Sequence, residues 1–148
     1  MKRVAVIYDD GPRPETTGEY CLRALRGLVD AEYVSPAKLQ GLAAKPFDLY
    51  LFVDDGTEYP IPEMLRPSAF WAIDTHLDFQ GTLAKSRQHD FVFAAQKDGA
   101  DRLRAAGIAS ARWLPLACDP AMDQGDGEPE ANPATALRPS SPWPGNDR

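Results

Sequence analysis

The stretch Ala69-Phe-Trp-Ala-Ile-Asp-Thr-His-Leu-Asp-Phe79 joins an apolar run of strand-forming residues to a compact polar cluster. Its first five residues predict a buried strand. The polar residues that follow this strand are Asp74, Thr75, His76 and Asp78. In open parallel α/β sheets ligands bind in the crevice over the carboxyl ends of the strands, so the cluster predicts a site. Capping of the next helix is the structural alternative, because Asp and Thr are common helix caps.

Length and charge narrow the class of protein. The chain has 148 residues, of which 43% are hydrophobic, and these values suit one soluble domain with a buried core. A net charge of −6 argues against nucleic acid or an anionic membrane as the main partner. No apolar run approaches the length of a membrane span, and the N-terminus leads into a short strand rather than a signal peptide. We therefore expect a cytoplasmic protein.

The sequence gives no basis for a metal or a cofactor. Cys21 and Cys118 lack close-spaced partners, which argues against both a disulfide framework and a zinc site. His76 and His89 fall at opposite ends of a predicted helix, so they do not suit a shared metal ion. The glycine-rich motifs of dinucleotide-binding and P-loop proteins are absent from the sequence.

Hydrophobic patterning predicts a regular alternation of strands and helices. Strand patterns occupy residues 4–8, 31–34, 48–53, 69–73, 90–95 and 111–116, and helical patterns occupy residues 17–30, 36–42, 78–88 and 96–106. Continuous apolar strands of this kind are typical of parallel sheets that are buried on both faces. The alternation predicts an α/β fold, a Rossmann-like parallel sheet with helices on both faces.

Two local features qualify this pattern. In the first helical pattern, Leu28 and Val29 extend an apolar stripe that begins at Tyr20. Between Gly56 and Pro67 three prolines leave room for only a short connection between the third and fourth strands.

The chain divides into two parts by composition. Residues 1–118 carry the strand and helix patterns. Residues 119–148 are rich in proline and acidic residues, with six acids against two bases. Such a segment has too few aliphatic side chains to offset the conformational entropy lost on folding. We expect a disordered C-terminal tail.

Proton transfer is the chemistry that the central polar cluster could support. Histidine is the side chain that exchanges a proton most readily near neutral pH. On an extended segment residues i and i+2 lie on one face, so Asp74 could orient His76. These two residues are the predicted catalytic pair.

Four blocks of sequence carry a resemblance to a known family. They are DLYLFVDDG (48–56), LRPSAFWAIDTHLD (65–78), FVFAAQKDG (91–99) and WLPLACDP (113–120). Together these blocks resemble the N-terminal half of CgeB-like glycosyltransferases, a branch of the GT-B fold. The resemblance covers about half of the chain closely.

The resemblance implies a two-domain enzyme that transfers a sugar. The N-terminal domain would contact a sugar or glycan acceptor and handle its proton, with Asp74 and His76 at the matching position. The C-terminal domain would bind the nucleotide-sugar donor. The residues then expected to line the cleft on the acceptor side are Asp10, Gly11, Asp54, Asp55, Thr75, Gln96 and Lys97.

The sequence departs from this family after residue 120. Where the donor domain would begin, the acidic, proline-rich segment takes over. We therefore expect a truncated or stand-alone acceptor-side domain that is inactive without a donor-domain polypeptide as partner.

Two other functions stay open. The chain also resembles phosphoacceptor receiver domains in single residues at the strand ends, namely Asp9, Asp10, Asp54, Thr75 and Lys97. These carboxylates would bind Mg²⁺ while the lysine contacts a phosphorylated aspartate. The short connection between the third and fourth strands, and Asp98 after Lys97, depart from that class. The last alternative is a non-catalytic interaction module.

Overall fold

The computed structural model describes residues 1–9, 11 and 16–117, and residues Met1–Ala117 form one compact unit. The predictions for Asp10, for Cys118 and for residues 119–148 lie outside the described residues.

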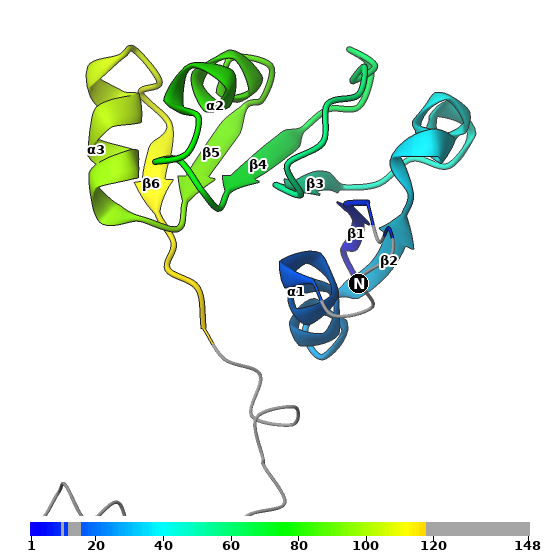
Figure 1. The fold of residues 1–148 in the computed structure, drawn as a ribbon. Helices are drawn as coiled ribbons and strands as arrows, with labels where there is room; N and C mark the ends of the chain where they lie inside the picture. The colour runs from blue at the N-terminus through cyan, green and yellow to red at the C-terminus, as the bar shows by residue number, and fades with distance from the viewer. Residues whose placement is uncertain (10, 12–15, 118–148) are drawn as a thin grey trace, which may run out of the picture. The chain divides into compact units, whose positions relative to one another are not determined.

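The predicted alternation of strands and helices is confirmed (Figure 1). In chain order the elements are β1 (Arg3–Ile7), α1 (Thr17–Arg26), β2 (Asp30–Val34), the 3₁₀ helix η1 (Pro36–Ala44), β3 (Leu49–Val53), β4 (Ser68–Ala72), α2 (Phe79–Ser86), β5 (Phe91–Ala94), α3 (Lys97–Ala105) and β6 (Ala111–Trp113). All five residues of β4 are buried, as expected for a strand covered on both faces.

The first helix ends earlier than its apolar stripe predicts. The Oγ1 atom of Thr16 caps it by accepting a hydrogen bond from Glu19 N, and the helix then stops at Arg26. The amides of Leu28 and Val29 both donate to Leu25 O in a tight turn. The predicted continuation to residue 30 is therefore wrong, and Leu28 is 76% exposed instead of packing inward.

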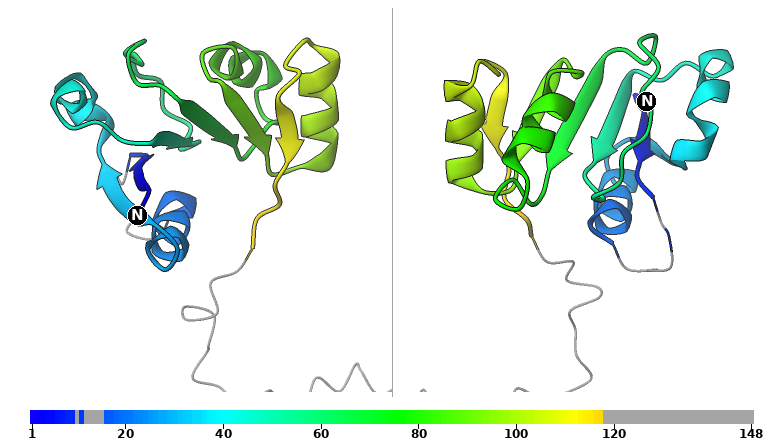
Figure 2. Two further views of the ribbon diagram at one scale, coloured as in Figure 1. Left: turned by 180° about the vertical axis from the view of Figure 1, so that it is seen from behind. Right: turned by 45° about the horizontal axis from the view of Figure 1, so that its top comes forward.

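The sheet has six parallel strands in the order β2-β1-β3-β4-β5-β6. The fold is thus the predicted Rossmann-like α/β sheet, with the strand order of the flavodoxin-like class. The chain leaves β1 through α1 toward β2, but leaves β3 toward β4 on the other side (Figure 2). This reversal makes β1 and β3 the topological switch point, where open α/β sheets bind ligands.

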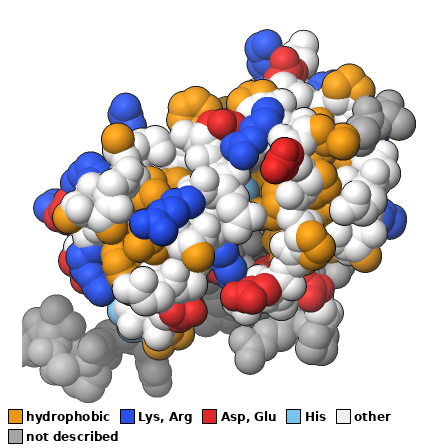
Figure 3. Space-filling view, turned by 90° about the horizontal axis from the view of Figure 1, so that it is seen from above, with side chains coloured by type: hydrophobic (Ala, Val, Ile, Leu, Met, Phe, Trp, Pro, Cys, Tyr) orange, Lys and Arg blue, Asp and Glu red, His pale blue; other side chains and the backbone are white. Residues whose placement is uncertain are grey.

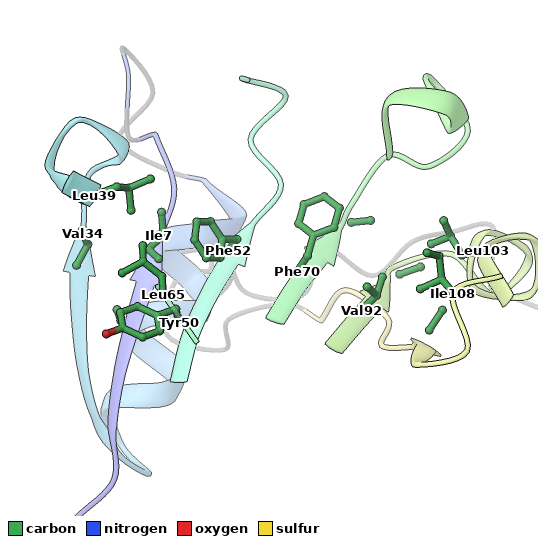
Figure 4. Close-up of a cluster of buried hydrophobic side chains, with 14 of the residues drawn as sticks. Ile7, Val34, Leu39, Tyr50, Phe52, Leu65, Phe70, Val92, Leu103 and Ile108 are labelled. Carbon is green, nitrogen blue, oxygen red and sulfur yellow. The ribbon is translucent and has the colours of Figure 1, made fainter. Parts of the chain in front are cut away.

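Two apolar clusters hold helices against the two faces of the sheet. One face carries α1, whose Leu22 packs with Val4 and Val6 of β1. The other face carries η1, α2 and α3. On that side Phe52 and Phe70 project from neighbouring strands into the same cluster as Leu39 and Leu103 (Figure 4). The predicted helices on both faces are confirmed.

The connection between β3 and β4 forms no regular helix, as its prolines predict. Leu65 is its anchor, with 1% of its surface exposed, and Tyr59 and Ile61 pack against the same apolar cluster. This segment therefore covers part of the sheet that a helix would otherwise cover. Within the described part of the chain, none of the helices has the length and apolar character needed to cross a membrane.

Candidate functional site

A cleft of about 750 Å³ lies at the carboxyl ends of β1, β3 and β4, over the switch point of the sheet. We call it the strand-end cleft. Its described walls come from the loop after β1, the start of α1, residues 53–58 after β3, the end of β4 and one side of α2. Parallel strands bring their ends to one edge of the sheet, so residues far apart in sequence meet here.

Asp55 joins two walls of the cleft. Its Oδ2 atom accepts a hydrogen bond of 2.6 Å from the backbone N–H of Asp9, which follows β1. Its Oδ1 atom accepts bonds from the backbone N–H and the hydroxyl of Thr57, at 2.8 and 2.6 Å. Asp55 was predicted to bind substrate, and the structure gives it this bracing contact between the loops.

Asp54 makes similar contacts at the ends of β3 and β4. Its carboxylate accepts hydrogen bonds from the backbone N–H groups of Gly56, at 3.2 Å, and Ile73, at 3.4 Å. The ammonium group of Lys85 lies 3.7 Å from the same carboxylate, and only 13% of the Asp54 side chain is exposed. These contacts hold the Asp54 carboxylate in one position in the floor of the cleft.

One side of α2 forms a wall that the sequence analysis missed. Asp78 caps the helix by accepting a hydrogen bond of 2.9 Å from Gly81 N. Gly81, Thr82 and Lys85 then line the cleft. Because these positions recur at helical spacing, they share one face of α2. The periodic signal was present in the sequence, but nothing in it indicated that this face borders the ends of β1 and β3.

The predicted catalytic pair is not held together. The side chain of Asp74 is exposed and lines the strand-end cleft, whereas His76 is exposed but is not part of the described cleft lining. The amide of Leu77 donates to Asp74 O at 3.0 Å, so these residues form a turn and not the extended segment that the prediction assumed. Of the pair, the structure brings only Asp74 to the other strand-end carboxylates.

Thr75 points away from the cleft into the packed interior. It is 1% exposed, and its hydroxyl donates a hydrogen bond of 2.9 Å to Gln96 Oε1. Lys97 lies at the start of α3, where its ammonium group is 3.4 Å from Asp101. Neither Gln96 nor Lys97 contributes to the described cleft lining, whereas Gly11, Asp54 and Asp55 do.

The strand-end cleft is acidic. Its described lining contains the carboxylates of Asp9, Asp54, Asp55, Glu58, Asp74 and Asp78 and one basic side chain, that of Lys85. A lining of this charge repels phosphate and other anions and favours neutral hydroxylated molecules or cations. In the described part of the chain no cluster of three or more His, Cys, Asp or Glu residues has a geometry suited to a metal ion.

The cleft continues into a second space of about 520 Å³, between α2 and the connection that follows β3. We call this space the aromatic compartment, because Phe52, Phe70, Tyr59 and His89 line it. Figure 3 looks down on this face and shows the hollow, with acidic side chains gathered toward one end. Residues Asp54, Asp55 and Lys85 border both spaces.

His89 is the buried polar residue in the lining of the aromatic compartment. It is 9% exposed, and its Nδ1 atom lies 3.2 Å from the hydroxyl of Ser68. Burial, and then the nearby charge of Arg66, lower the pKa of His89 to about 4, so the ring is neutral at pH 7. Burial and the charges of Asp55, Asp54 and Asp9 raise the pKa of Tyr59, which keeps its hydroxyl protonated.

Comparison of the chain with protein-family models, with curated proteins and with solved structures found no match.

Proposed function

We propose that the domain is the acceptor-side half of a GT-B glycosyltransferase, and that the strand-end cleft receives a neutral, hydroxyl-rich acceptor. The observation that carries this proposal is the gathering of Asp9, Asp54, Asp55 and Asp74 around one 750 Å³ cleft at the switch point. Carboxylates accept hydrogen bonds from hydroxyl groups, and the volume falls in the range of small-molecule sites. The sequence blocks of the CgeB-like family support the same assignment.

Charge decides which substrate of a sugar transfer this cleft suits. A nucleotide-sugar donor carries a diphosphate, which six carboxylates in the described lining would repel. A sugar or glycan acceptor is neutral and offers hydroxyl donors. We therefore assign the donor to a separate domain or polypeptide and the acceptor to the strand-end cleft.

Asp74 is the proposed group for handling the acceptor proton. Its carboxylate lines the cleft, is exposed, and takes part in none of the hydrogen bonds found among the described residues. By contrast, Asp54 and Asp55 are committed to backbone N–H groups. A general base must reach the proton that it removes, and a carboxylate that lines the cleft without another hydrogen bond is placed to do so. His76 retains a proposed role only if donor binding brings it to the acceptor.

Binding of simple sugars tests the proposal directly. The ¹⁵N-labelled chain is titrated with methyl β-glucoside, methyl β-galactoside and methyl N-acetyl-β-glucosaminide. We expect amide shifts at Gly56, Asp74 and Gly81 with at least one of them. Asp74→Asn should weaken that binding about tenfold, the loss expected for a hydrogen bond to a charged group. Glu63→Gln is the control, because Glu63 is exposed and outside the described cleft lining. No shift at these amides, or equal binding by both variants, contradicts the proposal.

Catalysis is tested by adding a donor domain. The chain is mixed with a candidate donor-domain polypeptide and UDP-glucose, and nucleotide release is measured. The proposal expects a rate above that of the donor polypeptide alone, reduced by Asp74→Ala. If His76→Ala leaves the rate unchanged, the role of His76 is removed and that of Asp74 remains.

One observation favours the receiver alternative as a second candidate. The strand order β2-β1-β3-β4-β5 is that of flavodoxin-like proteins, the class to which receivers belong. The contacts differ from those expected, since Lys97 lies beside Asp101 and it is Lys85 that approaches Asp54. Incubation with acetyl phosphate and Mg²⁺ separates the hypotheses. A stable phosphoryl group that is lost in Asp54→Asn supports the receiver function.

A further inference from the structure

We propose that the aromatic compartment is a binding site for an aromatic ring that carries a hydroxyl group, with the ring between Phe70 and Tyr59 and the hydroxyl on His89 Nε2. The aromatic compartment is separate from the space assigned to the sugar, and a ring can bind there whether or not the domain takes part in sugar transfer.

Aromatic and aliphatic side chains form one part of the compartment lining, and charged residues form the part shared with the strand-end cleft. Phe52 and Phe70 form its floor from adjacent strands, and their ring centroids lie 4.8 and 5.4 Å from that of His89. The ring of His89 stacks on Phe70 with an interplanar angle of 18°. Tyr59 and Ile61 close the side opposite α2. Aromatic walls gain energy from stacked and edge-on contacts with a further ring.

The contacts around Ser68 favour one tautomer of His89. The Ser68 hydroxyl accepts a bond from Arg66 Nη1 at 3.0 Å and donates to the carboxylate of Asp90 at 3.4 Å. A carboxylate is a stronger acceptor than a neutral imidazole, so the single hydroxyl proton goes to Asp90. In the tautomer that this arrangement favours, the Nδ1 atom of His89 donates its proton to the Ser68 oxygen, 3.2 Å away.

This tautomer leaves Nε2 of His89 as a hydrogen-bond acceptor. The residue is more than nine-tenths buried and lines the compartment, while its other nitrogen is held by Ser68. Among the described residues no hydrogen bond to Nε2 is found, and Nε2 is not one of the fully buried polar atoms that lack a partner, so it keeps accessible surface. An accessible acceptor that no protein group occupies can take a hydrogen bond from a ligand that brings a donor. A phenol supplies both the ring and the O–H group.

The opening of the compartment gives a way to block it. Ala84 is an exposed residue of α2 that lines the compartment. Ala84→Trp should fill the opening without disturbing the core. Gln80→Trp is the matched control, because Gln80 is exposed on the same helix and lies outside the described lining of both spaces.

The probe is 2-naphthol, compared with 2-methoxynaphthalene, which has the ring but no donor. The full chain is titrated by NMR, with the ring protons of its two histidines as reporters and His76→Gln to assign them. We expect 2-naphthol to shift the His89 signals and not those of His76. It should bind roughly three- to tenfold more tightly than the methyl ether, as expected for one neutral hydrogen bond.

Three variants complete the test. His89→Phe keeps a ring against Phe52 and Phe70, so it should retain binding of both probes but lose the preference for 2-naphthol. Ala84→Trp should abolish binding of both, and Gln80→Trp should bind as the natural sequence does. A structural role of His89 alone would leave the preference unchanged in His89→Phe. Equal affinity of the natural chain for both probes, or shifts at His76, would overturn the inference.

The outcomes separate this inference from the proposed function. If 2-naphthol binds at His89 while no methyl glycoside perturbs the strand-end cleft, the aromatic site stands and the sugar site fails. If glycosides bind and 2-naphthol does not, the reverse holds. If both bind at once, the compartment and the cleft are two sites that can be occupied together.

Discussion

The side chain of Thr75 lies directly against the backbone of Gly99, with no room between them for a β-carbon. A Cβ atom added to Gly99 would overlap Thr75 Oγ1 and lie 3.0 Å from Thr75 Cβ. Both residues are buried, and the side-chain oxygen of Gln96, just before α3, accepts a hydrogen bond from the Thr75 hydroxyl. The contact fixes α3 against the end of β4 and explains why Thr75 does not face the cleft.

Replacing Gly99 therefore reverses the usual rule for glycine in a helix. In an unobstructed helix, Gly→Ala stabilises by up to about 1 kcal/mol. Gly99→Ala should instead destabilise by about 1–3 kcal/mol, because the new methyl group overpacks a buried contact. Urea unfolding measures the change, and Gly27→Ala is the control, since the nearest atom to its added Cβ would be 3.7 Å away.

A double-mutant cycle identifies the cause of the effect. Thr75→Ala removes the Oγ1 and Cγ2 atoms that a Cβ at position 99 would meet. The Gly99→Ala change should therefore cost less in the Thr75→Ala background than in the natural chain. Additive effects of the two changes would show that the overlap with Thr75 does not limit this position.

Loss of the Asp55 carboxylate should loosen the strand-end cleft. The carboxylate accepts three hydrogen bonds that join Asp9 and Thr57. Asp55→Ala should lower the free energy of unfolding by about 1–3 kcal/mol and speed amide exchange at Asp9 and Thr57. The control is Glu58→Gln, which alters another carboxylate of the cleft whose residue is exposed. Equal stability and exchange in the two variants would contradict the bracing role of Asp55.

The fold was predictable because its strands are nearly continuous apolar runs. Residues such as Phe70 and Ala72 of β4, or Val6 and Ile7 of β1, are buried whichever face they point toward, and the sequence pattern reports this burial. Strand order was not predictable, since it depends on which crossover passes to which side of β1. Leu28 fits the helical apolar stripe, but the turn at Gly27 places it outside the helix.

The site was predictable only where it depends on strand ends. Asp54, Asp55 and Asp74 follow strands, and parallel strands end at one edge, so their convergence follows from the pattern. The pairing of Asp74 with His76 assumed an extended segment, whereas the chain turns between Asp74 and Leu77. His89 and Lys85 were missed because their roles depend on which side of α2 faces the proline-rich connection, and this contact has no local sequence signal.

Cys21 should react slowly with thiol reagents. Its burial on the inner side of α1 raises the pKa of the thiol to about 11. At pH 8 the reactive thiolate should then be about a hundred times scarcer than for a free cysteine. The measurement uses Ellman's reagent on Cys118→Ser, which leaves Cys21 as the sole thiol of the chain. Denaturation should restore an ordinary rate, and a fast reaction of the folded protein would show that the thiol is accessible and ionised.

Stability should rise with pH between about 4 and 6.5 because of His89. In the folded protein burial lowers the pKa of His89 to about 4, and an unfolded histidine has a pKa of about 6.5. Between these values the unfolded chain binds more protons than the folded one, so protonation favours unfolding as the pH falls. Protonation of the unfolded chain should lower the free energy of unfolding by about 3 kcal/mol at the acidic end of this interval. Above pH 7 this destabilisation should be almost absent.

Two variants isolate the histidine from the carboxylates that also titrate at low pH. The backbone N–H of Ser68 and the nearby Arg66 lower the pKa of Asp90, so that carboxylate weakens the fold only at the acidic end of the range. Urea unfolding is therefore compared between pH 5 and 7. The rise of the unfolding free energy with pH should disappear in His89→Phe, which keeps a ring against Phe52 and Phe70. It should persist in His76→Gln, which alters an exposed histidine. If the slope persists in His89→Phe, another group carries it, and His89 is not held neutral by its burial beneath the aromatic compartment.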